Sequence, residues 1–318
     1  MIIINIDASA LSRSSCMLRF WNTVIHGYRS KLNANDIEYG TAFHKFAAHL
    51  AHTKGLNRFE AFKIATDYFK TKPMIVKPKK DHLNVSHLAN TMLGYCDKFL
   101  DPNDGGFICD YDILRKPGEE DTKAMAEMKF SYQIYEDDVF VINLCGTVDL
   151  LVKIHNGCYA IADYKTTSVW SDKEYFAGYR LSPQIIFYTY ILQQYAIKYP
   201  DSIFERIVKT GFGAFIEGLF LHPTNATRFL RSEVFFFKTE QIQEFVEMLN
   251  AKIEMIKKYA RLNLQPLREG MLNGACHTQY GMCSFANVCA LPDEVSRQHV
   301  LKNTFIQKHY NPLTFDKD

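Results

Sequence analysis

Two acidic residues and a lysine lie close together in the middle of the sequence. Asp149 ends the segment Gly-Thr-Val-Asp, and Asp163 and Lys165 follow it in a second β-rich run. A hairpin between the two runs would bring these residues to the same end of a sheet. Residues two apart on a strand share one face, so Asp163 and Lys165 point the same way, and Asp149 can reach that face from the neighbouring strand.

Two carboxylates beside an amine indicate a divalent-metal site. Carboxylate oxygens are hard ligands that suit magnesium or manganese, and these metals keep bound water molecules that can react. A lysine next to such a metal can position or deprotonate the attacking water. The alternative is an exposed ion pair at the end of a strand, which these three residues taken alone also allow.

A second group of reactive side chains follows later in the sequence. Cys276, Cys283 and Cys289 fall within fourteen residues. Thiolates favour zinc or an iron–sulfur cluster, and both commonly take four ligands. The paired C-x-x-C of zinc ribbons is absent from this segment. The other cysteines in apolar or strand contexts are expected to fill the core, and they are Cys96, Cys109, Cys145 and Cys158.

Composition limits the class of protein. The chain has 318 residues, of which 47% are hydrophobic and 23% charged, so it folds and can build a core without metal or disulfides. Its net charge of +2 gives no argument for a polyanionic partner. Locally, residues 63–98 carry seven lysines and residues 110–138 carry nine acidic side chains, which are either solvated faces or a phosphate-binding flank beside a carboxylate-rich centre.

The sequence lacks several motifs that would point to other classes of protein. The opening MIIINIDASALS is neither a signal peptide nor a membrane span, so we expect a cytoplasmic protein, in the host cytoplasm if it is viral, with no membrane partner. Neither a G-x-x-x-x-G-K-[ST] phosphate loop nor a G-x-S-x-G elbow occurs. An ATPase motor and a serine hydrolase are therefore unsupported.

The hydrophobic pattern predicts the elements that must position these residues. Helices come first, an antiparallel run of strands follows, and helices and strands then alternate up to the cysteine-bearing segment. This order suggests one large domain in which a mixed sheet carries helices on its faces. The pattern favours helices over 8–28, 39–53, 59–70, 86–100, 183–199 and 240–262, turns at 102–106 and 155–157, and strands over 125–135, 139–154, 158–165, 207–221 and 227–238.

Four short motifs occur in a fixed order, and together they resemble the RecB-type branch of the PD-(D/E)XK nuclease superfamily. The resemblance implies a restriction-endonuclease-like α/β fold, with a mixed central sheet flanked by helices, a helical N-terminal part and a cysteine-ligated C-terminal segment. It implies one nuclease domain over residues 1–318 with a helical insertion at 54–106. The motifs are G-x-x-x-H at Gly40 to His44, G-x-x-D at Gly146 to Asp149, D-x-K at Asp163 to Lys165, and Q-x-x-x-Y at Gln184 to Tyr188.

The resemblance also implies a set of metal ligands. In this family the positions of His44, Asp149 and Asp163 bind the catalytic magnesium or manganese ion. The backbone carbonyl of Tyr164 is a further ligand on the same grounds. Glu127 sits at the start of the first strand, where many relatives have a glutamate.

DNA is the partner that the resemblance implies. Lys165 would handle the attacking water, and Gln184 and Tyr188 match positions that support the lysine and contact DNA in the family. The lysine-rich run that also contains Lys70 and Lys72 could border the path of a DNA strand, or it could be a solvated loop. The DNA-binding candidates in that run are Lys77, Lys79 and Lys80.

Some RecB-type nucleases, including AddB-like and CRISPR-adaptation enzymes, hold a [4Fe–4S] cluster with one cysteine before the nuclease motifs and three after them. Cys16 matches the first of these, and Cys276, Cys283 and Cys289 match the others. The last three are spaced by six and five residues, whereas the family pattern is two and five. Zinc, or His277 as a substitute ligand, therefore stays open as an alternative.

The sequence thus predicts a metal-dependent DNA exonuclease that hydrolyses phosphodiester bonds of single strands or free ends. The expected processes are recombination, repair, or phage or CRISPR DNA processing, with a helicase, recombinase or other protein as a possible partner. The alternative is a nuclease-fold DNA-binding subunit of a recombination or CRISPR-adaptation complex that cleaves weakly or not at all.

Overall fold

The computed structural model describes residues 1–31, 33–101, 111–116, 123–155, 157–169, 171–223, 227–262, 264–278 and 281–313. Cys109, the turn expected at 102–106 and the middle of the turn expected at 155–157 lie outside these ranges. Their predicted structures therefore stay predictions.

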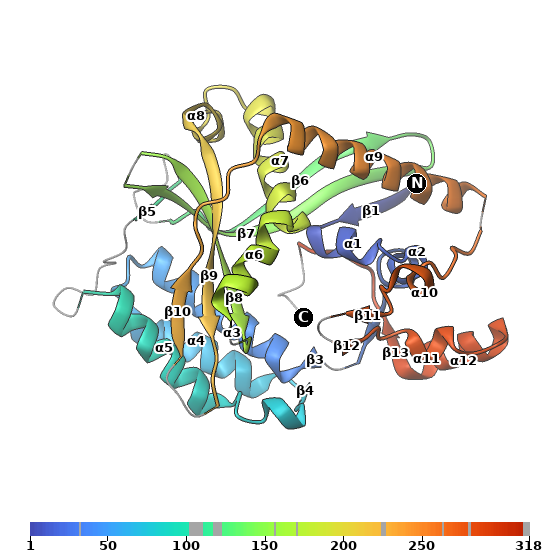
Figure 1. Cartoon of the computed structure of the whole chain (residues 1–318), viewed down its shortest axis with the longest axis horizontal. Helices are drawn as coiled ribbons and strands as arrows, with labels where there is room; N and C mark the ends of the chain where they lie inside the picture. The colour runs from blue at the N-terminus through green and yellow to red at the C-terminus, as the bar shows by residue number, and fades with distance from the viewer. Residues whose placement is uncertain are drawn as a thin grey trace.

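A mixed sheet of seven strands forms the centre of the molecule (Figure 1). The longest strand, β7, pairs with β5, β6 and β8 in antiparallel fashion and with β1 in parallel. On the far side of β8, β9 runs parallel to it, and β10 is antiparallel to β9. The expected mixed α/β fold is confirmed. The strands are β1 (Ile2–Ile6), β5 (Tyr111–Ile113), β6 (Ala126–Glu136), β7 (Phe140–Ile154), β8 (Tyr159–Thr167), β9 (Phe212–Phe220) and β10 (Arg228–Arg231).

Helices cover both faces of the sheet. Successive side chains of a strand point to opposite faces, and apolar side chains lie on both. Ile161 and Ile216 pack with α1 (Ala8–Arg13), α7 (Pro183–Lys198) and α9 (Thr239–Arg261) in one apolar core. Tyr164 and Leu219 pack instead with a second core on the other face. The helices of that second core are α3 (Asn35–His52), α4 (Arg58–Thr71) and α5 (Val85–Phe99), which lie together beside β9 and β10 in Figure 1.

The helix expected over 8–28 is wrong, because the chain breaks it near Cys16. The structure has α1, then α2 (Met17–Phe20) and a π-helical turn η1 (Trp21–Ile25). The hydroxyls of Ser14 and Ser15 donate to backbone carbonyls of the last turn of α1, which competes with continuation of the helix. Cys16 itself is extended and starts α2.

The strand expected over 207–221 is also wrong in its first part. Residues Ile203–Thr210 form α8, whose N-cap Ser202 accepts the backbone N–H of Glu205. Gly211, with φ of +103°, turns the chain into β9. The strand expected over 227–238 ends at Arg231, and β1 was not expected at all.

The C-terminal segment folds back onto the N-terminal one. Strand β13 (Phe305–Gln307) pairs with β2 (Tyr28–Ser30), and Phe285 stacks on Phe305 with ring centroids 4.8 Å apart. A small apolar core of Tyr28, Phe285, Val288, Leu301 and Phe305 holds this part together. Its elements are α10 (Gly270–Asn273), β11 (His277–Thr278), β12 (Gly281–Met282), α11 (Ala286–Cys289) and α12 (Glu294–Thr304).

Within the described ranges, we find no helix with both the length and the apolar character needed to cross a membrane.

Candidate active site

The acidic residues lie where the central sheet splits. The first half of β7 pairs with β1, and its second half pairs with β8 up to Leu150 opposite Ala162. Asp149 and Asp163 are the next residues on the two strands. Beyond this point β8 is held by β9, with Asp163 opposite Ile216. The two carboxylates therefore lie where the ladder between β7 and β8 has just ended.

Asp149 is fixed from both of its oxygens. Its side chain is almost buried, and Oδ2 accepts the backbone N–H of Tyr164 at 2.8 Å, which takes the place of a ladder bond between the strands. Its Oδ1 lies 3.3 Å from Nδ1 of His44, which projects from α3. The predicted pair His44 and Asp149 is thus brought together from two distant parts of the chain.

Glu127, at the start of β6, joins this pair. Its Oε1 lies 3.7 Å from Nδ1 of His44, and the three side chains offer ligand atoms within 4.8 Å of one another. Glu127 has φ of +47°, a left-handed conformation that costs energy for a residue with a side chain. Such conformations concentrate at functional sites, and no sequence signal at this position predicts one.

Asp163 and Lys165 share one face of β8, as expected. The Lys165 ammonium lies 2.5 Å from Oδ2 of Asp163, which is fully buried. Gln184, at the start of α7, donates from Nε2 to Oδ1 of Asp163 at 3.1 Å and also contacts the Tyr188 hydroxyl at 3.0 Å. Gln184, with Tyr188 behind it, therefore holds in place the Asp163 carboxylate that pairs with Lys165.

The electrostatics of the site favour an added cation. Burial raises the pKa of Asp163 to about 6. The nearby Lys165 ammonium lowers this pKa, and the negative charge of Asp149 raises it. Burial lowers the pKa of His44, but Asp149 and Glu127 outweigh it and raise that pKa to about 10. Lys165 also stays charged, because Asp163 and Asp149 outweigh its burial and raise its pKa. The acidic groups thus draw positive charge toward themselves.

The donor set fits a divalent metal ion. Oδ2 of Asp163 is buried without a hydrogen bond of normal geometry, although the Lys165 ammonium is close to it. Carboxylates with one imidazole are ligands that magnesium or manganese accepts. His44, Glu127 and Asp149 could hold such an ion, whereas Asp163, which the sequence also predicted as a ligand, is not a member of this group. A ligand role for the Tyr164 carbonyl stays a prediction.

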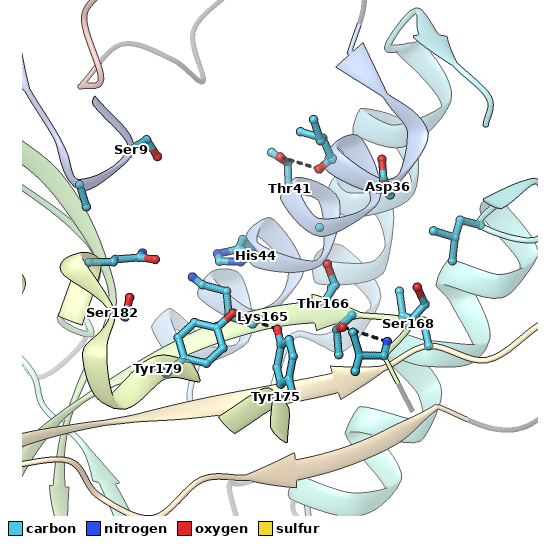
Figure 2. A pocket seen from close by; sticks show the side chains of 18 of the residues that line it. Ser9, Asp36, Thr41, His44, Lys165, Thr166, Ser168, Tyr175, Tyr179 and Ser182 are labelled. Atoms are coloured by element: carbon cyan, nitrogen blue, oxygen red, sulfur yellow. Dashed lines mark hydrogen bonds between the residues drawn. The ribbon is translucent and has the colours of Figure 1, made fainter. Parts of the chain in front are cut away.

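His44, Glu127, Lys165 and Gln184 line a cleft of about 1850 Å³ between α1, α3 and the segment that follows β8, and Asp149 and Asp163 are buried behind them. Figure 2 shows His44 and Lys165 pointing into it. The lysine-rich stretch forms part of the rim, where a strand pair β3 (Asn33–Ala34) and β4 (Met74–Ile75) leads into the short helix η2 (Pro78–Lys80). The lysines that line the cleft are Lys77, Lys79 and Lys80.

Two of these lysines already have partners. The Lys77 ammonium lies 3.0 Å from a carboxylate oxygen of Asp36, and Lys80 donates to the Ser168 hydroxyl at 2.5 Å. Lys79 is exposed. Lys70 and Lys72 do not line the cleft, and the Lys72 ammonium lies over the ring of Tyr68 instead.

The four cysteines of the second predicted site also come together. Cys16, Cys276, Cys283 and Cys289 line one small pocket, with Arg19 and Arg268 at its edge. Burial, followed by the charges of neighbouring thiols, raises the pKa of Cys276 and of Cys289. His277 lies on β11 and does not line the pocket.

Hydrogen bonds hold the backbone around the C-terminal cysteines and connect it to the backbone beside Cys16, which lies far away in the sequence. The Cys283 N–H donates to the Cys276 carbonyl at 2.8 Å, and the Asn273 side-chain amide donates to the Ser15 carbonyl at 2.5 Å. A Cβ on Gly270 would lie 3.3 Å from the sulfur atoms of both Cys16 and Cys276. A larger residue at position 270 would push against the thiols by a few tenths of an ångström.

The remaining described cysteines differ in their surroundings. Cys96 and Cys145 are buried, as expected of core-filling residues, whereas Cys158 is only partly buried. None of the three lines the pocket of the other four.

Comparison with known proteins identifies the class that this fold and site define. The model of the PD-(D/E)XK nuclease superfamily matches residues 9–290, so the chain belongs to that superfamily. The superfamily part of the expected resemblance is thereby confirmed, and with it a nuclease fold that takes DNA as substrate.

Among solved structures, the chain is similar to a candidate exonuclease from Eubacterium rectale, with 12% sequence identity and a TM-score of 0.44. The match covers 89% of this chain and 92% of that one. No curated protein matches the sequence.

Proposed function

We propose that this chain is a magnesium- or manganese-dependent DNA exonuclease of the RecB-type branch. One observation carries the proposal: side chains from α3, β7, β8 and α7 converge where β7 and β8 part. His44, Asp149 and Asp163 are the proposed metal ligands, and Glu127 joins them because its carboxylate lies in one group with His44 and Asp149. The order of the four motifs along the chain supports the RecB-type assignment.

The metal would supply a Lewis acid for the phosphate and lower the pKa of a bound water. Lys165 acts as an ammonium held by Asp163, because its pKa is raised. It positions the water and offsets negative charge that develops on the phosphate. Gln184 keeps the Asp163 carboxylate in place, and the Tyr188 hydroxyl steadies Gln184 in turn.

We further propose that Cys16, Cys276, Cys283 and Cys289 bind a [4Fe–4S] cluster that joins the two ends of the fold. In support, the four cysteines line one small pocket. Their order along the chain, one before the nuclease motifs and three after them, is the order of the cluster ligands in the family.

The proposed organisation is one nuclease domain over residues 1–318 that contains a helical insertion at 54–106. In support, α4 and α5 share an apolar core with α3 and with Tyr164 of the catalytic strand. An insertion packed in this way belongs to the nuclease core.

The test is incubation of the purified protein with end-labelled single-stranded and double-stranded DNA in magnesium or manganese, with and without EDTA. We expect cleavage that requires the metal. Linear and circular single strands of the same sequence then separate exonuclease from endonuclease, because only the linear strand has ends. DNA binding without cleavage would instead favour a DNA-binding subunit of a recombination or CRISPR-adaptation complex.

A further inference from the structure

Two tyrosines line the cleft on the side that the nuclease motifs do not use. Tyr175 lies on α6 (Asp172–Ala177), and Tyr179 lies four residues later on the 3-10 helix η3 (Gly178–Leu181). Their ring centroids are 5.3 Å apart, and the Tyr179 hydroxyl donates to the Tyr175 hydroxyl at 3.0 Å. In the view of Figure 2 both rings lie beside Lys165, on the side away from α3.

Aromatic packing fixes Tyr175 and Tyr179, which we call the tyrosine wall, to the end of β9. The ring of Tyr175 contacts Phe220 at 5.4 Å between centroids, and Phe176 contacts the same ring at 5.7 Å. A Cβ on Gly218 would come within 2.8 Å of Phe220 and 3.0 Å of Phe176, so the glycine lets these rings sit directly on the strand. The two tyrosines are therefore held in place while both remain partly exposed.

The two walls of the cleft differ in charge. The rim at η2 carries Lys77, Lys79 and Lys80, of which Lys77 pairs with Asp36, whereas the tyrosine wall carries the exposed Glu174. A phosphate backbone is attracted to the first wall and repelled by Glu174 at the second. A nucleic-acid strand in the cleft would therefore turn its phosphates toward the lysines and its bases toward the tyrosines.

We propose that Tyr175 and Tyr179 form a stacking surface for unpaired bases next to the scissile phosphate. The inference rests on the proposed nuclease function and adds a determinant of substrate choice. Aromatic side chains beside a basic groove are the general means by which proteins bind single-stranded nucleic acid, because every base has a face that can stack. Bases inside a duplex already stack on one another, so the surface selects single strands or frayed ends.

The test is equilibrium binding in EDTA, which prevents cleavage, of a short oligothymidine and of an abasic strand with the same length and charge. We expect the wild-type protein to bind oligothymidine more tightly. In Tyr175→Ala and Tyr179→Ala each, affinity for oligothymidine should fall by about 5- to 150-fold, the range for loss of one stacked base, and affinity for the abasic strand should not change.

Matched variants separate stacking from other effects. Tyr175→Phe and Tyr179→Phe keep the rings and remove the hydroxyl contact, so they should bind oligothymidine like the wild type. Tyr199→Ala removes a tyrosine that is 45% exposed and does not line the cleft, and it should also change nothing. Thermal unfolding of each variant shows whether the wall itself has been lost.

The outcomes distinguish this inference from the proposed function. Wild-type affinity for oligothymidine in both alanine variants, or an equal loss for the abasic strand, would overturn the stacking surface while cleavage by the wild type still supports a nuclease. A wild-type protein that neither binds nor cleaves any DNA would overturn both.

Discussion

The candidate active-site cleft and the cysteine pocket are built in opposite ways. Asp149, Asp163 and Lys165 come from two adjacent strands that lie between two large apolar cores. The cysteine pocket joins Cys16 to a segment that begins only at Arg268, and its apolar core contains five buried residues. The first site is positioned by the sheet itself, whereas the second positions the ends of the fold.

This difference predicts which part of the protein each substitution affects. A polar group in the cleft sits on a scaffold that is stable without it, so its loss should reduce chemistry and leave folding intact. A thiol in the pocket lies where few apolar contacts hold the backbone, so its loss should reduce stability.

The largest effect is expected for Asp163→Ala and Lys165→Ala. Each should lower kcat by about 1,000-fold or more, because each removes a group that we propose acts on the metal, the water or the phosphate. Cleavage of end-labelled DNA in manganese measures the rate, and circular dichroism checks that the fold is kept. Lys209→Ala removes an exposed lysine that pairs with Glu205 and should cleave like the wild type. Wild-type rates in either cleft variant would remove the active-site assignment.

Replacing any one of the four pocket cysteines by serine should lower both the bound iron and the free energy of unfolding. The variants are Cys16→Ser, Cys276→Ser, Cys283→Ser and Cys289→Ser. A link between Cys16 and the other three cysteines closes a loop that contains most of the chain, so it restricts the unfolded state. Its loss should lower the free energy of unfolding by about 4 kcal/mol, on the scale known for disulfides. Iron analysis and urea unfolding of anaerobically purified protein measure the two effects. Cys158→Ser is the matched control, because Cys158 does not line the pocket. Colourless protein with one bound zinc would contradict the cluster but keep the link between the segments.

His44→Ala should weaken metal binding by at least the ~10- to 100-fold that loss of a residue supporting a ligand costs, without unfolding the protein. Without metal, the pKa of His44 is raised to about 10, so at neutral pH the metal must displace a proton from this side chain. Affinity for manganese should therefore rise with pH in the wild type and depend less on pH in the variant. Calorimetric titration at several pH values measures both. An unchanged pH dependence in His44→Ala would show that His44 is not a ligand.

The smallest effect is expected at the lysine rim. Changing Lys77, Lys79 and Lys80 together to alanine should reduce the slope of log affinity against log salt by about two units, since each phosphate contact contributes about one. Two units are expected from three lysines because Lys77 already pairs with Asp36 and is not counted as a phosphate contact. An unchanged slope would place the DNA path elsewhere in the cleft.

Residues that act through local spacing could be predicted from the sequence. Asp163 with Lys165 and Gln184 with Tyr188 lie on regular elements, where two- and four-residue periods fix the shared face. Glu127 depends on a left-handed backbone in a strand, and β1 depends on a parallel partner far along the chain, so neither has a local signal. The tyrosine wall was also missed, because its position depends on Phe220 and on packing that spacing does not encode.

The pairing of β13 with β2 has a consequence for synthesis on the ribosome. Translation at its usual rate completes β8 on the order of ten seconds before it reaches Cys289. Cys16 and β2 are synthesised long before Cys276, Cys283, Cys289 and β13. The proposed cluster could therefore be inserted only after nearly the whole chain has been made, and until then β2 lacks the strand that pairs with it in the folded protein.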